Sequence, residues 1–478
     1  MKKCLTDFAV CASLMALWAC GGKDNPVTPG GGDTSQAPTA ITLSTESISA
    51  QQGGGEFPVT VTAPQRPSVS AKPDWVTVVD GTYNKETYKI TLTLKVTAYG
   101  DYGERTGNVT VKSGSLTKTL TITQQGREKP DMPDTDIAKN LVTSGATTEA
   151  QALYNYLLAN YGKKTVSGIM ANVNWNHEEA DKVYRAIGKY PALNCYDFIH
   201  ILYSGANWIN YSDITPVKEW ADAGGIVALM WHFNVPKTQA EPGPVDGVTC
   251  TPSETTFQVS NVFVDGSWEQ VWFDYYVDKV ADVILQLQEA GIAAIWRPFH
   301  EAAGNAMALQ QSYWTKAWFW WGFDGPETYK KLWNRLQDAF YAKGIRNLIW
   351  VWTAQDYNGD PSLYGSDAAY YPGDDRVDIV GRDIYGKGAE YNLTEFVSAQ
   401  NGYPHKMIAL SENGKDIVKD ENGKIVSSTD YGLMSDVWST GALWSWFMPW
   451  YGDNMPSTAW WQDALNCENV ITRDQVNY

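Results

Sequence analysis

An alternation of short apolar segments with longer helical ones runs through residues 139–478 and limits the folds open to this chain. Stretches between the apolar segments, such as 267–291 and 327–344, carry apolar residues three and four apart, which is typical of helices. Strands that are buried on both faces and separated by helices form parallel sheets. The eight candidate strands are 164–172, 190–198, 224–233, 291–301, 347–355, 377–385, 405–413 and 441–450.

Eight strands with interleaved helices favour an α/β fold of the (β/α)8 TIM-barrel type. The structural alternative is a doubly wound open sheet. Many such sheets carry a Gly-rich dinucleotide-binding turn after the first strand, and no such turn follows residues 164–172. The barrel is therefore the predicted fold of residues 139–478.

Polar and aromatic residues gather where the candidate strands end. In a barrel of this type the carboxyl ends of the strands form the active-site face. These side chains are therefore predicted to meet at one mouth. The strand-end residues are Asn172, Trp175, Asp197, His232, His300, Glu301, Gln355, Asp356, Asp383, Tyr385, Glu412 and Trp450.

Two strand-end carboxylates, Glu301 and Glu412, indicate cleavage of glycosidic bonds. One carboxyl group must be protonated to assist the leaving oxygen, and the other must be ionised to attack the anomeric carbon. A single glutamate at such a place is often only a salt-bridge partner, but two of them facing one mouth favour catalysis. His232 and His300 suggest a metal site, but no third ligand stands at a fixed spacing from them. We therefore expect neither a metal nor another cofactor.

Composition supports a carbohydrate cleft and argues against a nucleic-acid partner. Of the 22 tryptophans, 20 lie at or after Trp175. Such an enrichment suits either a large aromatic core or an aromatic-lined cleft, and a cluster such as 318–321 cannot point inward as a whole. The net charge of −17 and the lack of a Lys/Arg cluster exclude a typical nucleic-acid-binding surface. We expect a monomer.

The amino-terminal residues indicate export. Two lysines precede the apolar stretch 8–19, which is too short to span a membrane. Leu17-Trp18-Ala19-Cys20 resembles a bacterial lipobox, which predicts a lipoprotein signal peptide at 1–19 and lipidation of Cys20. The alternative is an ordinary secretory signal. The lipobox implies a lipid anchor in the cell envelope, at the outer membrane, with the face of that membrane left open.

Residues 40–126 differ from the rest of the chain because polar and β-branched residues alternate there with a period of two. Turns rich in Gly, Asn and Asp separate these runs, which predicts a small all-β, immunoglobulin-like antiparallel sandwich. Gly/Pro-rich polar segments flank it, a flexible tether at 20–39 and a linker at 127–138. The cysteines that remain after export and lipidation, Cys195, Cys250 and Cys467, form no disulfide framework.

Five motifs give the barrel region a specific resemblance. They are "RPFHEAAG", "WFWWG", "NLIWVWTAQ", "DIVGRDIYG" and "ALSENG". In this order, and across residues 139–478, they are similar to glycoside hydrolase family 26. The resemblance implies a retaining barrel enzyme that is mostly an endo-β-1,4-mannanase, acting on mannan, galactomannan or glucomannan. Minor activities of the family are β-1,3-xylanase and mixed-linkage β-glucanase. An alternative from another class is a non-catalytic glycan-binding surface lipoprotein.

The resemblance assigns the two catalytic roles. Glu301 matches the acid/base of the family and Glu412 matches its nucleophile. Tyr385 matches a tyrosine that hydrogen-bonds the nucleophile. On physical grounds Glu412 needs donors to stay charged, and Arg297 is a second candidate donor beside Tyr385.

The resemblance also assigns substrate-binding residues. His300 matches the histidine before the acid/base, and His232 matches a histidine that contacts substrate. Trp318 matches the first aromatic residue of the WFWWG motif, although the segment 302–317 is longer than in the best-known members. A further tryptophan should lie beneath the sugar at the cleavage site, and the two candidates for it are Trp450 and Trp446.

The sandwich region has its own resemblance. Trp75, the run "RTGNVTV" at 105–111 and the closing "ITQQG" are similar to a BACON-type module. The family name implies carbohydrate binding. No row of exposed aromatic residues is evident in the sequence, so a spacer is an equal alternative.

Overall fold

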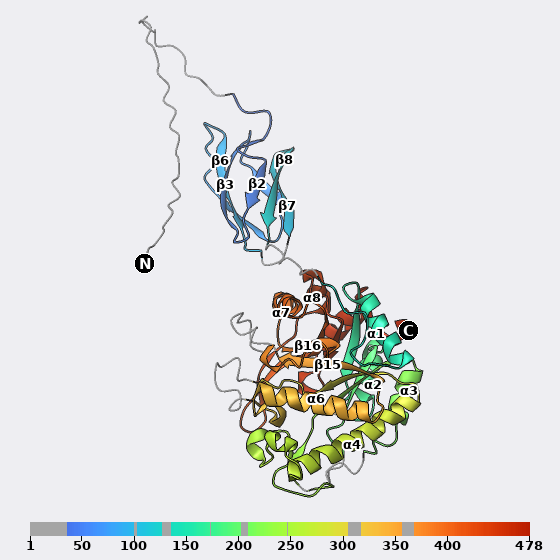
Figure 1. The fold of residues 1–478 in the computed structure, drawn as a ribbon. Helices are drawn as coiled ribbons and strands as arrows, with labels where there is room; N and C mark the ends of the chain where they lie inside the picture. The colour runs from blue at the N-terminus through green and yellow to red at the C-terminus, as the bar shows by residue number, and fades with distance from the viewer. Residues whose placement is uncertain are drawn as a thin grey trace, which may run out of the picture. The chain divides into compact units, whose positions relative to one another are not determined.

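A computed structural model describes residues 36–99, 103–126, 135–172, 174–201, 209–245, 247–304, 317–355 and 368–478. The chain divides into two compact units, one extending to Glu128 and the other beginning at Lys129 (Figure 1). This division falls within the predicted linker 127–138. The predicted signal peptide, Cys20 and most of the tether lie outside the described residues.

The first unit is a sandwich of two four-stranded sheets, as the alternation of polar and apolar residues predicts. One sheet has the order β1-β3-β6-β5 and the other β2-β8-β7-β4. The strands are β1 (Thr42–Leu43), β2 (Ser47–Ala50), β3 (Gly55–Thr62), β4 (Ser68–Ala71), β5 (Val76–Asp80), β6 (Lys89–Val96), β7 (Glu104–Ser113) and β8 (Leu116–Gln125). The pairing is antiparallel except for β2, which runs parallel to β8. The predicted antiparallel sandwich is therefore confirmed, with β2 as the one exception among the described strands.

The aromatic residues at one end of the sandwich are engaged within the module. The guanidinium of Arg105 lies 4.3 Å from the ring centroid of Trp75 and 4.3 Å from that of Tyr99. Trp75 also packs on Gly107, where a Cβ would lie 2.7 Å from its ring and 2.4 Å from Pro73. Through these contacts Trp75 stabilises the packing of the module.

The second unit contains a closed barrel of eight parallel strands, in agreement with the prediction. Around the barrel the order is β10-β11-β14-β15-β16-β17-β20-β9, and β9 pairs with β10 to close it. The short β21 (Val470–Ile471) pairs with β9 from outside this ring. The barrel strands are β9 (Thr165–Met170), β10 (Leu193–Asp197), β11 (Ile226–Trp231), β14 (Ala294–Pro298), β15 (Leu348–Gln355), β16 (Ile379–Tyr385), β17 (Met407–Gly414) and β20 (Trp446–Pro449).

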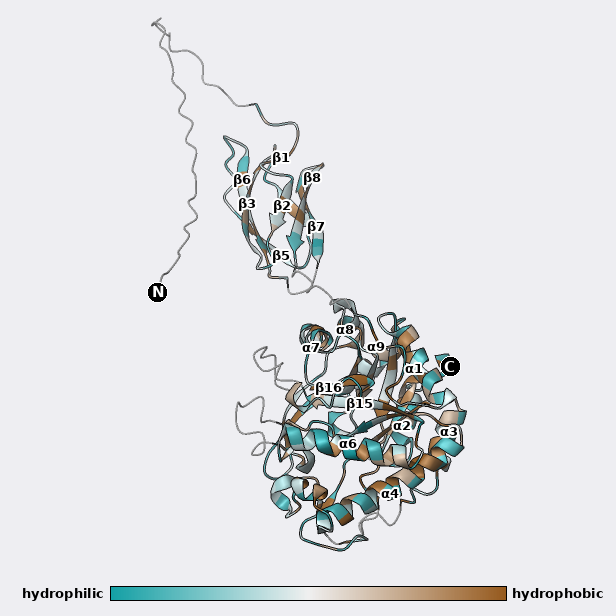
Figure 2. Cartoon of the chain, in the orientation of Figure 1, coloured by the Kyte–Doolittle hydropathy of each residue, from teal (hydrophilic) through white to brown (hydrophobic). Residues whose placement is uncertain are grey.

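Helices cover the outside of the barrel (Figure 1). They are α1 (Thr148–Asn160), α2 (Glu178–Ile187), α3 (Thr215–Asp222), α4 (Trp268–Glu289), α6 (Pro326–Ala342), α7 (Ala389–Gly402), α8 (Met434–Thr440) and α9 (Thr458–Asn466). Polar and apolar residues mix along α4 and α6, whereas the strands between the helices are largely apolar (Figure 2). The helices bury their apolar stripe against these strands.

Two short strand pairs lie in the segments that follow barrel strands. A short pair, β12 (Val235–Pro236) and β13 (Val248–Thr249), follows β11, and a hairpin of β18 (Asp416–Lys419) and β19 (Ile425–Thr429) follows β17. Among the described residues, none of the helices combines the length and the apolar character that a membrane span requires.

Candidate active site

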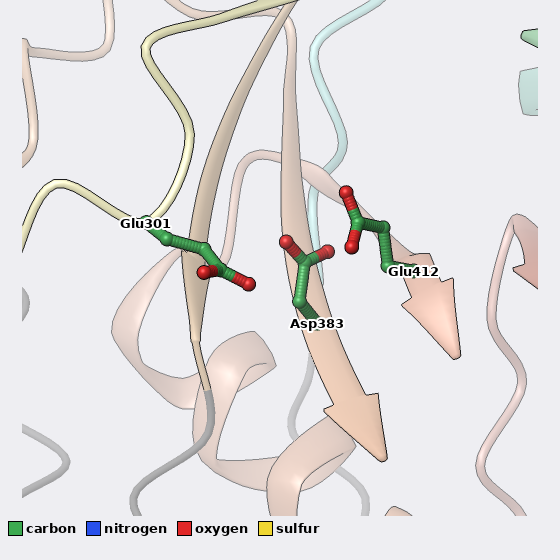
Figure 3. A group of neighbouring side chains, drawn as sticks. All are labelled: Glu301, Asp383 and Glu412. Carbon is green, nitrogen blue, oxygen red and sulfur yellow. The ribbon is translucent and has the colours of Figure 1, made fainter. Parts of the chain in front are cut away.

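The turn that follows β14 carries Glu301 in a strained backbone. Phe299 and Glu301 have φ values of 50° and 52°. Non-glycine residues rarely adopt such left-handed conformations, and those that do are concentrated at functional sites. The amide of Glu301 donates a hydrogen bond of 3.1 Å to the carbonyl of Thr353 in β15. The turn directs the carboxyl group of Glu301 toward β16 and β17 (Figure 3).

The WFWWG segment braces this turn. The buried Trp321 donates from its indole nitrogen to the carbonyl of His300 at 2.8 Å, and Trp320 donates to a carbonyl just after β11 at 2.5 Å. At Gly322 a Cβ would lie 1.7 Å from the carbonyl oxygen of Ala302. Only glycine allows the segment to approach the backbone next to Glu301 this closely.

Glu412 lies in β17, at the opposite side of the site, and two donors hold it. The hydroxyl of Tyr385 donates to Glu412 Oε2 at 2.6 Å, and Arg297 donates to Oε1. The same guanidinium donates to Asp383 Oδ2 at 3.0 Å. The two donors proposed for Glu412 on physical grounds are therefore the ones that contact it.

Three carboxyl groups meet at the centre of the mouth. Asp383 lies between Glu301 and Glu412, and all three side chains point toward one another (Figure 3). One oxygen from each lies within 4.8 Å of those of the other two. Asp383 also accepts a hydrogen bond of 2.8 Å from Ser411 and is hydrogen-bonded to Glu301.

Burial and like charge keep a proton in this cluster. Burial raises the pKa of Glu301 well above its ordinary value, and the nearby Asp383 and Glu412 raise it further. Burial and Glu412 also raise the pKa of Asp383, to about 7, against the opposing effect of Arg297. Both effects favour the protonated form of Glu301, which donates a hydrogen bond to Asp383. A protonated carboxyl group facing a nucleophilic one is what a retaining glycosidase requires.

Three carboxylates at such distances could bind a metal ion instead of transferring a proton. The charged groups around them decide between these two roles. Burial opposes the charge of Arg297, but Glu412 and Asp383 outweigh burial and raise the pKa of the guanidinium. This permanent cation already balances Asp383 and Glu412, and Glu301 shares its proton with Asp383. The residues suit proton transfer better than metal binding.

Two histidines flank the carboxyl cluster with their rings 4.6 Å apart. His232 Nδ1 lies 2.5 Å from Asp197 Oδ2, which leaves Nε2 as the ring nitrogen able to reach a substrate. His300 is buried, and burial, Arg297 and His232 lower its pKa well below its ordinary value. His300 therefore remains neutral at the pH of most cells, and it adds no further charge to the site.

The structure separates the two candidate tryptophans of β20. Trp450 follows the strand at its carboxyl end, with its ring 6.0 Å from that of His232. Trp446 pairs with Val166 at the other end of the strand and belongs to the buried core of the barrel. Four strand residues span about 13 Å. Trp450 is therefore the tryptophan at the mouth.

Phe319, the neighbour of Trp318, lies against the histidines. Its ring is 4.9 Å from His300 and 5.7 Å from His232, and it stacks on Trp321 at 4.3 Å. Trp318 is half-buried and touches Phe319 edge-on at 6.5 Å. Sequence reasoning chose Trp318 for a substrate contact, whereas this geometry brings Phe319 closer to the catalytic centre.

The sequence assigns no role in the site to Asp383 or Asp197, although both stand at predicted strand ends. Asp383 stands two residues before Tyr385, so that both side chains face the same side of β16, and this spacing was the available signal. Trp175, also a strand-end residue, is buried among Tyr196 and other rings. Asp356 and most of the segment 302–317 lie outside the described residues.

Comparison with known families identifies the barrel. Residues 142–474 match the family model of glycosyl hydrolase family 26. The chain belongs to glycosyl hydrolase family 26. Residues 65–125 match the BACON family, described as an N-terminal binding domain, which confirms the predicted module. The two family regions account for both compact units.

The curated relatives of the chain include named mannanases. The chain is 31% identical over 356 residues to a mannan endo-1,4-beta-mannosidase of Thermothelomyces thermophilus, covering 72% of this chain and 63% of the relative. It is 28% identical over 351 residues to mannan endo-1,4-beta-mannosidase A of a Piromyces species, covering 70% and 50%. The chain thus spans about half to two thirds of these curated relatives.

Solved structures of mannanases resemble the barrel unit. One is the family 26 domain of an endo-beta-mannanase/endo-beta-glucanase from Prevotella bryantii, with 50% identity and a TM-score of 0.66. The match covers 71% of this chain and 100% of that one. Another is a beta-mannanase from a symbiotic protist of the termite Reticulitermes speratus, with 30% identity, a TM-score of 0.55, and coverage of 72% and 99%.

Proposed function

We propose that the protein is a retaining, endo-acting glycoside hydrolase that cleaves internal β-1,4-mannosidic bonds of mannan, galactomannan or glucomannan. The observation that supports the proposal is the pair of Glu301 and Glu412, whose carboxyl oxygens lie within 4.8 Å of each other. Burial and neighbouring carboxylates raise the pKa of Glu301, whereas Arg297 and Tyr385 donate hydrogen bonds to Glu412. Retaining enzymes hold their carboxyl groups about 5–5.5 Å apart, and inverting enzymes need about 6.5–9.5 Å to admit a water molecule. The short separation favours direct attack.

In the first step Glu412 attacks the anomeric carbon while Glu301 gives its proton to the leaving glycosidic oxygen. The carbon–oxygen bond breaks, and a glycosyl ester of Glu412 forms. Arg297 and Tyr385 hold the attacking carboxylate in place beforehand.

In the second step a water molecule replaces the sugar on Glu412. Once Glu412 is esterified, its negative charge no longer raises the pKa of Glu301, so Glu301 can accept a proton from the water. The water oxygen bonds to the anomeric carbon, and the ester bond to Glu412 breaks. Two displacements on opposite faces leave the β configuration of the substrate in the product.

The substrate is proposed from the family and from the polar rim of the site. The named relatives are mannan endo-1,4-beta-mannosidases. His232 and His300 offer polar groups that can read the axial 2-hydroxyl of mannose, and a glucose unit would leave them unpaired. β-1,3-Xylan and mixed-linkage β-glucan are the alternatives within the family. A non-catalytic glycan-binding role does not account for the protonated Glu301 facing a held Glu412.

Product analysis tests this function. Linear mannan, galactomannan, glucomannan, β-1,3-xylan, lichenan and cellulose would be incubated with the full-length protein. We expect rapid loss of viscosity with the mannans before reducing ends accumulate, and proton NMR should show the β-anomer first. Preference for β-1,3-xylan or lichenan would overturn the substrate, and an initial α-anomer would overturn retention.

We further propose that the protein is monomeric and lipid-anchored through Cys20 at the outer membrane of a cell envelope. The support is the amino-terminal sequence, in which an apolar stretch leads to Leu17-Trp18-Ala19-Cys20. The BACON module would act as a spacer between the anchor and the barrel, since Trp75 and Tyr99 are engaged with Arg105. Binding of the isolated segment 36–126 to insoluble mannan would contradict the spacer role.

A further inference from the structure

A hollow of about 460 Å³ lies beside the barrel mouth, outside the catalytic cluster. It opens between the segments that follow β9 and β20 and continues between α2 and α9, which contact each other. We call it the α2–α9 recess. The residues on which the argument rests are Asn172, Glu179, Lys182, Ala186, Tyr451 and Trp461.

Tyr451 connects the recess to the catalytic centre. It follows Trp450 directly, and their rings are 5.3 Å apart. Burial raises the pKa of the Tyr451 phenol, and the charges of Asp197, Glu179 and Glu412 raise it further. Tyr451 lines the recess and lies against Trp450 at the mouth, so a substrate in the mouth borders the recess.

The recess offers the chemistry that sugars bind. The side chain of Glu179 is only 5% exposed and accepts a hydrogen bond of 2.6 Å from Lys182, whose side chain is 56% exposed. Trp461 is 3% exposed, and its indole nitrogen has no hydrogen-bond partner among the described residues. A buried carboxylate, an ammonium group and aromatic rings supply donors, acceptors and apolar faces for a ring bearing hydroxyl groups.

The direction of the recess indicates which sugar it takes. Both Glu179 and Ala186 line it, and seven residues of α2 span about 10 Å. In this fold each helix runs from the mouth toward the opposite end of the barrel. The recess therefore descends from the rim along the outside of the barrel. A polysaccharide backbone that crosses the mouth passes over it, whereas a side group of the backbone can enter it.

The barrel order places the recess relative to the cleaved bond. β20 lies diametrically across the barrel from β14, the strand that Glu301 follows, and β9 is the next strand beyond β20. The leaving chain takes its proton from Glu301 and departs on that side. The recess therefore serves the part of the substrate that becomes bonded to Glu412.

We propose that the α2–α9 recess binds a single hexosyl side group of the polysaccharide, such as the galactosyl groups of galactomannan. The proposal rests on the proposed function and adds a specificity site to it. A galactosyl group on the part of the substrate that becomes bonded to Glu412 would then strengthen binding to the enzyme.

A recess-filling variant tests the proposal. Ala186 is an exposed helical residue, and Ala186→Trp fills the recess without touching the catalytic cluster. We expect kcat/KM on galactosyl-substituted manno-oligosaccharides to fall about tenfold and that on unsubstituted ones to stay within about twofold. Ala342→Trp at the exposed end of α6 is the matched control and should change neither. Thermal unfolding of both variants would confirm that they fold.

A second variant removes contacts instead of filling space. Glu179→Gln should weaken binding of the substituted oligosaccharide to a Glu412→Ala protein, measured by calorimetry, and leave binding of the linear one unchanged. Equal losses of affinity for both oligosaccharides would mean that the recess binds the polysaccharide backbone, and this would overturn the side-group proposal. No loss of affinity for either oligosaccharide would overturn it as well. Failure of the unaltered protein to hydrolyse linear mannan would instead contradict the proposed function.

Discussion

Glu301 and Asp383 are hydrogen-bonded to each other through their carboxyl groups at the centre of the barrel mouth. Asp383 raises the pKa of Glu301, and the proton they share is the one that the leaving oxygen needs. Arg297 then binds both Asp383 and Glu412, so the acid and the nucleophile belong to one network. The charge of each group therefore depends on the others.

The pH dependence of activity should report this network. The first step needs Glu301 in its protonated form, so kcat/KM should fall as the pH rises through the elevated pKa of Glu301. Asp383→Asn removes a negative charge that raises this pKa, and the basic limb of the profile should therefore move to lower pH. Asp278→Asn on the exposed face of α4 is the control and should leave the profile in place. An unmoved limb in Asp383→Asn would show that Asp383 does not raise the pKa of Glu301.

Replacing each glutamate should affect a different step. Glu412→Ala should lower kcat by about 10⁴-fold or more on every substrate, because no covalent intermediate forms. Glu301→Ala should lower kcat on mannan by about 10²–10⁴-fold but retain formation of the glycosyl ester from substrates with activated leaving groups. Azide should then restore turnover. Equal losses on both kinds of substrate without rescue would contradict the acid/base role.

Loss of the phenol that holds Glu412 should slow the reaction without unfolding the protein. Tyr385→Phe removes the 2.6 Å hydrogen bond to Glu412 Oε2 and keeps the ring. A hydrogen bond to a charged group contributes about 1.5–3 kcal/mol, so kcat should fall by about 10–100-fold. Steady-state kinetics would measure the loss. An unchanged kcat would mean that Arg297 alone holds the nucleophile.

The close approach at Gly322 should make this glycine necessary for both stability and activity. The added methyl of Gly322→Ala would overlap the carbonyl of Ala302, and the strain should lower the free energy of unfolding by about 1–3 kcal/mol and displace Glu301. Gly402→Ala meets nothing within 4 Å and is the matched control. Denaturant unfolding and activity would be measured together. Equal behaviour of the two variants would contradict the bracing role of the WFWWG segment.

The predicted lipid anchor can be tested independently of catalysis. Cys20→Ala should move the protein from the membrane fraction to the soluble fraction, because the acyl chains that hold it would be missing. Hydrolysis of soluble mannan should not change, since more than 100 residues of the chain separate Cys20 from the barrel region that begins at residue 139. Cell fractionation with antibody detection would measure the distribution. Membrane retention of the variant would contradict lipidation.

The pattern of apolar residues in the sequence was sufficient to predict the fold. Each of the eight candidate strand segments coincides with one barrel strand, and only β17 extends beyond its segment, by one residue, because strands buried on both faces require continuous apolar runs. The sandwich was also predicted, but not the parallel pairing of β2 with β8, since alternation reveals which face is buried and not the direction of the neighbour.

The sequence by itself determined that Glu301, Glu412, Tyr385 and Arg297 stand at or near strand ends, because carboxyl ends of parallel strands meet at one mouth. Only the tertiary structure decided how charge is shared there. Asp383 lies between the two glutamates, and Phe319 rather than Trp318 lies against the histidines. Hydrogen bonding and burial depend on distances between residues far apart in the chain, and local sequence patterns carry no information on those distances.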